Sequence, residues 1–266
     1  MLIPKILRGL AAVFALAAFS AHAALSEDKP LRVGVTAGPH AQVFEAVKKI
    51  AARDGLKIDI IEFSDYVQPN AALAAGDLDL NSYQHQPYLD SAVKDRGYKL
   101  VSVGRTILFP IGLYSRKFKS LDQIPEGARL AMPNDPTNGG RVLLLLEAKG
   151  LIKLKANAGL KATPLDVVEN PKKLKFIELD AAQLPRALDD ADVAAINTNF
   201  AIQAGMMPSR DAIAMESLQS PYANIIAVRA EDKDSPVIKK LLKAFQNDEI
   251  KAFIKKEFKD SVFPAW

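Results

Sequence analysis

Cysteine is absent from this sequence of 266 residues. The absence excludes disulfide bonds, thiolate catalysis, and zinc or iron–sulfur sites built on cysteine ligands. It also excludes a lipid attached to an N-terminal cysteine. The folded chain must therefore be held together by its own core, and 49% hydrophobic residues are enough to form one.

Long hydrophobic runs are absent beyond the first two dozen residues. There, basic Lys5 and Arg8 precede a short apolar run, AAVFALAAF, and the small-residue pattern AHA at 21–23. This order is typical of a secretory signal peptide, and the run is shorter than the roughly 18 apolar residues of a membrane-spanning helix. We predict a signal peptide over 1–23, cleaved after its last residue, and a flexible lead-in over 24–30. The mature protein would then be soluble and periplasmic; an N-terminal membrane anchor or a buried N-terminal helix is the alternative.

Charge is not gathered in one place. The formal net charge is +4 and the pI is about 9.0, but basic residues are scattered and have acidic neighbours, as in AEDKDSPVIKK. A nucleic-acid-binding protein would carry a basic stripe or patch, which this sequence lacks. We therefore predict no nucleic-acid partner, and the excess charge bears on solubility alone.

Strand-like and helix-like segments alternate along the chain in two series. Strands have alternating or continuous apolar residues, and helices have apolar residues three and four apart. The predicted strands are 31–37, 56–63, 78–81, 129–133, 174–179, 193–196 and 224–229, with an extended stretch at 99–115. The predicted helices are 42–55, 69–77, 86–97, 136–149, 164–170, 181–191, 198–205 and two amphipathic helices between Ser235 and Phe258.

This alternation predicts an α/β fold in which sheets are covered by helices, and two series suggest two lobes. Extended segments near 107–115 and 222–229 are expected to cross between them. We predict lobe 1 at 31–110 plus 229–266, which includes the C-terminal helices, and lobe 2 at 111–228. Strand ends and helix starts would then face each other across a cleft, where ligands of such folds bind.

The first candidate site residues are aromatic. Tyr66, Tyr83, His85 and Tyr88 lie where predicted strands give way to helices. Tyr83 and His85 alternate, so they point the same way in an extended segment. Together the rings could form a pocket wall that is apolar but able to form hydrogen bonds. The alternative is ordinary tyrosine packing with a structural histidine.

A catalytic role for His85 is the enzymatic alternative. A general base needs a nucleophile or substrate proton within reach, but the sequence has no G-x-S-x-G elbow and no HExxH motif. No cluster of histidines and carboxylates has metal-ligand spacing. We therefore predict no metal, no cofactor and no enzymatic activity.

The segment NDPTNGGR, residues 134–141, joins a predicted buried strand to a leucine-rich helix. If Asp135 caps a helix that starts at Pro136, Asn138 and Arg141 lie three apart on one face near the positive end of the helix. Arginine there offers a planar fork for a carboxylate or phosphate. The segment matches neither the Walker A nor the G-x-G-x-x-G nucleotide motif. An arginine in a surface ion pair is the alternative.

Two asparagines complete the candidate set. Asn197 follows a buried strand, and Asn224 opens another. An amide oxygen can accept a hydrogen bond from an ammonium group, although asparagines also serve in turns and caps. Taken together, the arginine, the amide oxygens and the rings are suited to a zwitterion: a carboxylate, an ammonium and an apolar side chain.

At these residues the sequence resembles the methionine-binding lipoprotein (MetQ/NlpA) family, the substrate-binding subunits of methionine ABC importers. The resemblance spans Leu31 to the C-terminus. It is carried by DYVQPNAALAAGDLD, QHQPYLD, KDRGYKLVSVG, PNDPTNGGR, LLLLEAKGLIKL, LDVVENPKKLK, QLPRALDD, AINTNFA and SPYANI.

The resemblance implies a two-lobed, type II-like periplasmic-binding-protein fold, with a mixed sheet in each lobe and the ligand in the cleft between them. It implies L-methionine as ligand and a membrane permease as partner, and we expect a monomer. It places the methionine side chain among Tyr66, Tyr83, His85 and Tyr88, and its carboxylate on Arg141. The amino and carboxylate groups would meet Asn197 and Asn224, with Asn138 as a further candidate.

Two positions differ from the family pattern. Ala24 stands where a lipid-bearing cysteine is usual, which suggests a freely diffusing protein. Tyr83 stands where phenylalanine is common, and its hydroxyl could favour a more polar ligand or point to solvent. D-methionine, a methionine derivative or a short methionine peptide are therefore alternative ligands, and a periplasmic enzyme using His85 is the alternative of another class.

Overall fold

A computed structural model describes residues 25–266. The predicted signal peptide at 1–23 and Ala24 lie outside the described residues. Within the predicted lead-in, Leu25 packs against the core of the first lobe, and the Glu27 carboxylate pairs with the Lys240 ammonium at 2.7 Å. This part of the lead-in therefore lies against the folded domain.

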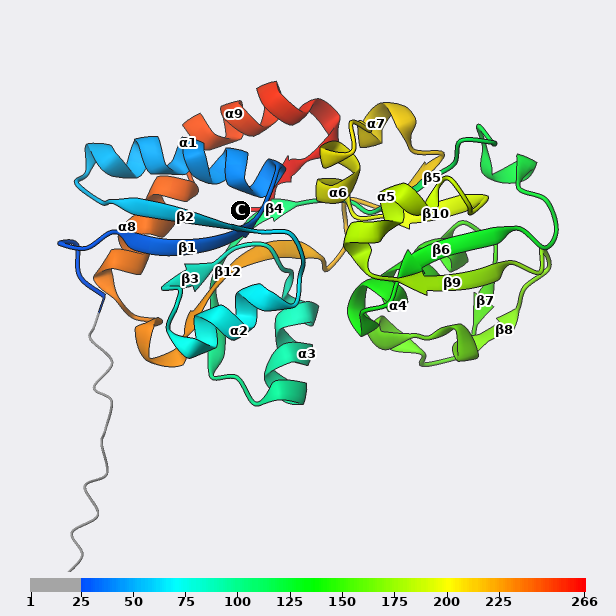
Figure 1. Cartoon of the computed structure of the whole chain (residues 1–266), viewed down its shortest axis with the longest axis horizontal. Helices are drawn as coiled ribbons and strands as arrows, with labels where there is room; N and C mark the ends of the chain where they lie inside the picture. The colour runs from blue at the N-terminus through cyan, green and yellow to red at the C-terminus, as the bar shows by residue number, and fades with distance from the viewer. Residues whose placement is uncertain (1–24) are drawn as a thin grey trace, which may run out of the picture.

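The first lobe is a six-stranded mixed sheet flanked by helices (Figure 1). Its strand order is β13-β4-β12-β3-β1-β2, with β1 parallel to β2 and β3 and with β12 antiparallel to β3 and β4. The strands are β1 (Leu31–Thr36), β2 (Ile58–Phe63), β3 (Leu80–Asn81), β4 (Leu100–Leu108), β12 (Ala223–Arg229) and β13 (Phe263–Pro264). The helices are α1 (Pro39–Arg53), α2 (Gln68–Ala75), α3 (Gln86–Arg96), α8 (Pro236–Phe245) and α9 (Asp248–Phe258).

Alternation along β12 shows how this sheet buries both faces. Ile226 and Val228 join the core beneath α1, α8 and α9, while Ile225 and Ala227 join the core beneath α2 and α3. Successive strand residues point to opposite faces, so a central strand covered on both sides is apolar throughout. The C-terminal helices thus return to the first lobe, as the sequence predicts.

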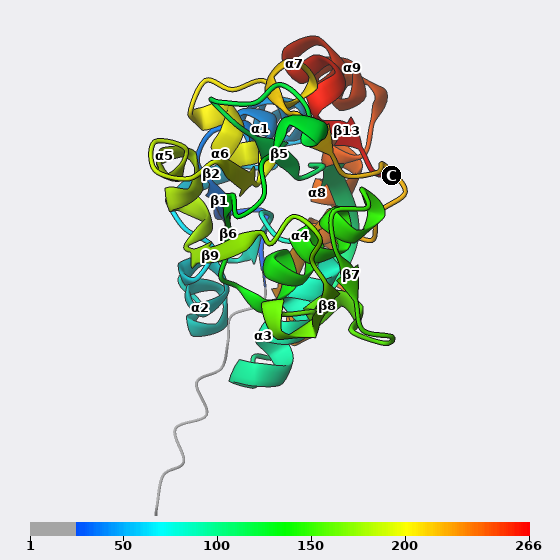
Figure 2. The ribbon, with the colours of Figure 1, turned by 90° about the vertical axis from the view of Figure 1, so that its right-hand side faces the viewer.

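The second lobe repeats the plan around a five-stranded mixed sheet of order β11-β5-β10-β6-β9. Figure 2 looks onto this lobe, with α4 on one side of the strands and α5 and α6 on the other. The strands are β5 (Gly112–Tyr114), β6 (Arg129–Pro133), β9 (Lys175–Leu179), β10 (Val193–Ile196) and β11 (Ala214–Met215), and β7 (Lys153–Leu154) pairs separately with β8 (Val167–Glu169). The helices are α4 (Pro136–Ala148), α5 (Leu184–Ala187), α6 (Thr198–Gln203) and α7 (Pro208–Asp211).

Two segments cross between the lobes. The first leaves β4 and enters β5 through residues 109–111, and the second leaves β11 and enters β12 through residues 216–222. They run side by side, because the Glu216 amide donates to the Ile111 carbonyl at 3.0 Å and Ala223 pairs with Leu108. Residues 223–228 lie in the sheet of the first lobe, although the predicted boundary of lobe 2 includes them.

The helix predicted at 164–170 is not present. A single 3-10 turn at Pro164–Asp166 leads directly into β8. Two adjacent β-branched residues, Val167 and Val168, favour the strand, and Thr163 and Asp166 hold the turn with a reciprocal capping box. In the described part of the chain, no helix combines the length and the apolar character needed to cross a membrane.

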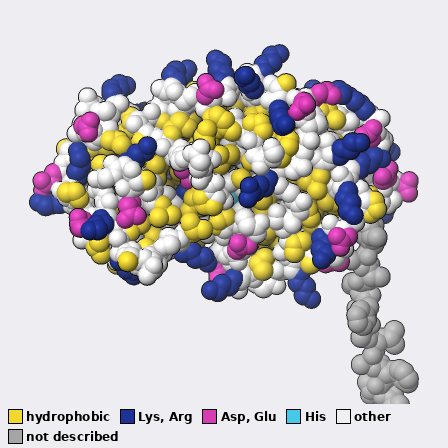
Figure 3. All heavy atoms as spheres, turned by 180° about the vertical axis from the view of Figure 1, so that it is seen from behind, with side chains coloured by type: hydrophobic (Ala, Val, Ile, Leu, Met, Phe, Trp, Pro, Cys, Tyr) yellow, Lys and Arg dark blue, Asp and Glu magenta, His cyan; other side chains and the backbone are white. Residues whose placement is uncertain are grey.

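The surface of the described residues carries charges of both signs (Figure 3). Figure 3 shows basic and acidic side chains interspersed over the back of both lobes. Many are paired across the surface, as Arg53 with Glu249 and Lys117 with Asp192.

Gly140 in α4 is required by packing. A Cβ atom there would lie 2.3 Å from the Leu160 carbonyl oxygen, which is closer than such atoms can approach. We predict that Gly140→Ala lowers the free energy of unfolding by about 1–3 kcal/mol, because backbone has to move. Urea unfolding measures this, and Ala148→Ser at the exposed end of the same helix is the control. Equal stability of the two variants would contradict the packing argument.

Candidate functional site

The carboxyl ends of the strands and the starts of the helices from both lobes converge on one cavity. All eight residues predicted from the sequence line it: Tyr66, Tyr83, His85, Tyr88, Asn138, Arg141, Asn197 and Asn224. Gln84, Phe109, Thr198 and Asn199 also line it and were not predicted. Hydrogen bonds cross the cavity directly between the lobes, so the structure is a closed form.

Three tyrosines form one wall of the cavity. The hydroxyls of Tyr83 and Tyr88 both donate to the Tyr66 carbonyl, at 3.0 and 2.9 Å, and the Tyr66 hydroxyl donates to Asn199 Oδ1 of the second lobe at 2.5 Å. Burial raises the pKa of all three phenols, which therefore stay neutral. Since every hydroxyl is already engaged, the wall presents mainly ring surface. The Tyr83 hydroxyl points away from solvent and has no proton left to donate to a ligand.

His85 is neutral, and hydrogen bonds at its two ring nitrogens fix its tautomer. Its Nδ1 accepts a hydrogen bond from the Tyr88 amide at 3.2 Å and so caps α3, while its Nε2 donates to Asn138 Oδ1 at 3.3 Å. Burial, and then the nearby charge of Arg141, lower its pKa to about 3. With both ring nitrogens engaged and a pKa this low, His85 is poorly suited to act as a general base.

Asn138 joins the two lobes at the start of α4. Asp135 caps this helix: its Oδ1 accepts from the Asn138 amide and its Oδ2 from Asn138 Nδ2, both at 2.9 Å. A carboxylate can only accept, so Asn138 must turn its amide oxygen into the cavity. That oxygen accepts from His85 and from Asn197 Nδ2, the latter at 3.1 Å. The predicted cap is confirmed.

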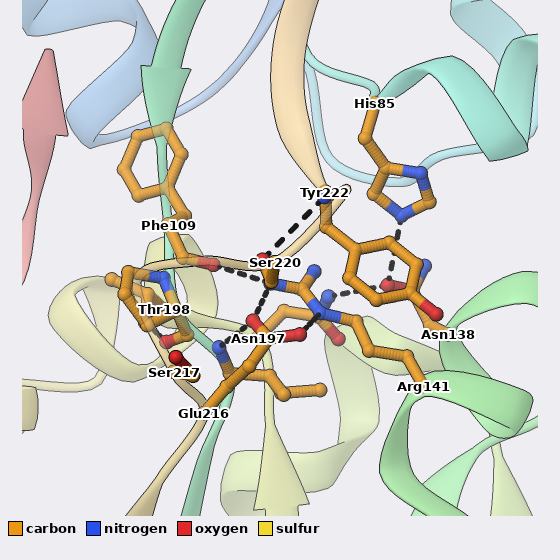
Figure 4. Close-up of polar contacts among 12 residues, drawn as sticks. His85, Phe109, Asn138, Arg141, Asn197, Thr198, Glu216, Ser217, Ser220 and Tyr222 are labelled. Carbon is orange, nitrogen blue, oxygen red and sulfur yellow. Dashed lines mark hydrogen bonds and ion pairs between the residues drawn. The ribbon is translucent and has the colours of Figure 1, made fainter. Parts of the chain in front are cut away.

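Arg141 lies one turn further along α4 and forms a buried ion pair with Glu216 (Figure 4). Its Nε donates to Glu216 Oε1 at 2.9 Å and its Nη2 to Oε2 at 2.5 Å. The Nη2 also donates to the Phe109 carbonyl at 2.8 Å, and the Tyr222 ring stacks on the guanidinium, 4.5 Å from its carbon. The arginine is thus tied to both crossings between the lobes.

This pairing restricts what Arg141 can offer a ligand. The side edge of its fork is occupied by Glu216, and only Nη1 has no hydrogen-bond partner among the described residues. Because the carboxylate balances the guanidinium, the site carries no net charge from this pair. An anionic ligand would gain less binding free energy here than beside an unpaired arginine. A zwitterion, which has no net charge, suits a site that also has none from this pair.

The two asparagines each leave an amide oxygen without a partner. Asn197 Oδ1 is buried and makes no hydrogen bond. Asn224 donates through Nδ2 to His40 and to the Tyr83 carbonyl, and its Oδ1 has no partner among the described residues. One lobe therefore supplies Asn197 and the other Asn224, each as an acceptor. A buried acceptor without a donor is costly, which favours a ligand that brings N–H groups.

Sequence reasoning missed three important residues. Tyr222 lies within the motif SPYANI, and Asn199 lies within AINTNFA. Both motifs carry the family resemblance, so both residues could have been predicted as part of the site. Glu216 had no such signal, because it stands in a segment without a motif. The requirement for an acidic partner follows once Arg141 is known to be buried, but nothing in the sequence says which of 31 acidic residues provides it.

Fold and site together define a class: a two-lobed α/β binding protein of the periplasmic-binding-protein type, with its site between the lobes. The chain belongs to the NlpA lipoprotein family, whose model matches residues 31–266. The D-methionine-binding lipoprotein MetQ of Escherichia coli K12 is 51% identical over 239 residues, which cover 89% of this chain and 88% of that protein. The protein of the same name from Salmonella typhimurium is 49% identical, over 96% of this chain and 97% of its own.

Solved structures also resemble this chain in sequence and in fold. A nutrient-binding protein from Burkholderia cenocepacia, bound to methionine, is 61% identical with a TM-score of 0.87, and the match covers 89% of this chain and all of that one. A structure of the methionine-binding protein MetQ is 51% identical with a TM-score of 0.86, over 89% of this chain and 98% of that one. Fold and family are therefore shown.

The ion pair gives a stability prediction. Glu216→Gln removes the charge that balances a buried guanidinium, and we expect the free energy of unfolding to fall by about 3–5 kcal/mol. Chemical denaturation measures this. The control is Glu249→Gln in an exposed ion pair with Arg53, where we expect a change below about 1 kcal/mol. A loss at Glu216 no larger than the control would mean that the buried pair is not formed.

Neutral buried histidines give a pH prediction. His85 and His40 both have a pKa of about 3, lowered mainly by burial, against about 6.5 in an unfolded chain. Between these values the unfolded chain binds protons that the folded chain does not, so stability falls as pH drops from about 6.5. Each histidine should contribute about 1.4 kcal/mol per pH unit.

Urea unfolding between about pH 7 and pH 5 measures this slope, in a range mostly above the titration of carboxylates. His85→Gln, which cannot titrate, should remove about half of it. A stability that stays constant over this interval would contradict the neutral assignment of both rings.

Proposed function

We propose that this protein is the substrate-binding protein of an ABC importer and that it binds methionine. The proposal rests on the free groups in one closed cavity: two N–H groups on Arg141 Nη1, the unpaired Asn199 Nδ2, two unpaired amide oxygens, and a wall of rings. These match the three parts of an apolar amino acid. Methionine is favoured because relatives of about 50% identity are named for D-methionine binding and a 61% identical neighbour was solved with methionine bound.

The carboxylate of the ligand would bind Arg141 through Nη1. A charge-assisted hydrogen bond of this kind is roughly twice as strong as a neutral one. Because Glu216 and Phe109 fix the guanidinium, little conformational entropy is lost on binding. The carboxylate would therefore meet a donor that is already in place.

The ammonium group would lie between the lobes. It has three N–H donors, and Asn197 Oδ1 and Asn224 Oδ1 supply an acceptor from each lobe. Neither oxygen has a partner among the described residues. A ligand that brings donors to both therefore favours the closed form over the open one, which is how a ligand can drive closure.

The thioether would lie against the tyrosine wall. Sulfur at a ring edge gains about 0.3–1.5 kcal/mol. The wall has few free polar groups, because the hydroxyls of Tyr66, Tyr83 and Tyr88 are engaged with protein acceptors. A ligand with a polar side chain would lose hydrogen bonds to water there and form few new ones with the protein, so a ligand with an apolar side chain is preferred.

We propose further that the protein diffuses freely in the periplasm, although its relatives are named lipoproteins. Lipid attachment of that type requires a cysteine, and the sequence contains none. The partner would be the membrane permease of a methionine ABC transporter, which accepts the closed, loaded form.

Two alternatives remain for experiment. The same cavity could hold D-methionine or a methionine derivative, and the relatives named for D-methionine give this its support. An enzyme using His85 is disfavoured by the engagement of both ring nitrogens. Native mass spectrometry of gently purified protein identifies the ligand, and turnover of any amino acid that is lost in His85→Gln would restore the enzymatic alternative.

Arg141 provides the direct binding test. We predict that Arg141→Lys weakens L-methionine binding at least about tenfold, because lysine cannot hold Glu216 and present a fixed N–H to the ligand together. Isothermal titration calorimetry measures the affinity, and Arg53→Lys on the surface is the control. Affinity within twofold of wild type would contradict the carboxylate assignment.

A further inference from the structure

His40 lies behind the cavity and is not among the residues that line it. It sits in the first turn of α1 and is only 2% exposed. Its ring contacts Phe109 at 4.5 Å between centroids. One ring nitrogen faces Thr36 Oγ1 at 2.7 Å, and the other faces Asn224 Nδ2 at 2.8 Å. A buried histidine between two polar side chains, one of them in the site, requires an explanation.

The Tyr83 carbonyl settles the orientation of the Asn224 amide. It lies 3.2 Å from the terminal atom of Asn224 that also faces His40. A carbonyl oxygen can only accept, so that atom must be the NH2 group. Both of its hydrogens are then used, one by Tyr83 and one by His40. The remaining atom, Oδ1, is the one available to the cavity.

The same geometry settles the tautomer of His40. Its Nε2 receives the Asn224 hydrogen and must be unprotonated, so the neutral ring carries its proton on Nδ1 and donates to Thr36 Oγ1. A ring with its proton on Nε2 would place two donors against each other. Thr36 at the end of β1 therefore fixes His40, and His40 fixes Asn224.

We propose that His40 is a positioning residue that makes Asn224 an acceptor, so that Asn224 recognises the ligand's ammonium group rather than its carboxylate. This rests on the proposed function for the identity of the ligand, but not for the orientation of the amide. Without His40, the amide could turn and offer NH2 to the cavity. The ligand's ammonium group would then keep only Asn197 Oδ1 as an acceptor, and the preference for ligands that carry an amine would weaken.

Calorimetry with two ligands tests the proposal: L-methionine and its desamino analogue, which keeps the carboxylate and the thioether. His40→Phe preserves an aromatic ring but removes the acceptor. We expect methionine to bind about 10- to 150-fold more weakly, as for one lost hydrogen bond to a charged group, and the analogue to change less than twofold. In an Asn224→Ala background, His40→Phe should have no further effect. Phe44→Leu, in the core one turn along α1, is the control for general destabilisation.

Equal weakening of both ligands, or a His40 effect that persists in full without Asn224, would overturn the proposal. If wild-type protein did not bind methionine at all, the proposed function would be wrong, but the positioning role would still be decided by nitrogen NMR of the ligand-free protein. The proton of His40 should lie on Nδ1 at neutral pH. A proton on Nε2 would refute the proposal, and this measurement also decides it should His40→Phe fail to fold.

Discussion

The buried pair of Arg141 and Glu216 is the interaction on which the site depends. It joins the start of α4 to the second crossing, and through the Phe109 carbonyl to the first. A lone guanidinium at this depth would be costly, and the pair makes it tolerable while leaving one nitrogen free. The group that would hold the ligand is thus anchored to both segments that cross between the lobes. Under the proposed function, ligand binding and lobe closure would share a single set of contacts.

Most other polar groups of the site are also hydrogen-bonded within the protein. His85 Nδ1 and the Asn138 amide take part in helix caps. The three tyrosine hydroxyls donate to Tyr66 or Asn199, and the Asn224 NH2 group donates to His40. What remains is a small number of acceptors and donors. A ligand must supply the complementary groups or leave buried polar atoms unpaired, which is how such a cavity discriminates. Selectivity for the proposed ligand would then arise largely from groups that do not touch it.

Much of this could be predicted from the sequence, because local rules govern it. The βα alternation gives two lobes, and Asp135 followed by Pro136 gives the start of α4. What failed was non-local. The segment 164–170 resembles a helix until its pairing with β7 is known, and the boundary of the second lobe depends on β12 joining a sheet formed by residues over a hundred positions earlier. The role of Glu216 likewise cannot be predicted before the fold shows that it lies beside Arg141.

A crystal structure of the complex with L-methionine would test the role of Arg141 most directly. We expect the ligand carboxylate to lie within hydrogen-bond distance of Arg141 Nη1, while Nε and Nη2 remain on Glu216. We expect the ammonium group between Asn197 Oδ1 and Asn224 Oδ1. A carboxylate that displaced Glu216 from the guanidinium, or that bound away from Arg141, would contradict this role.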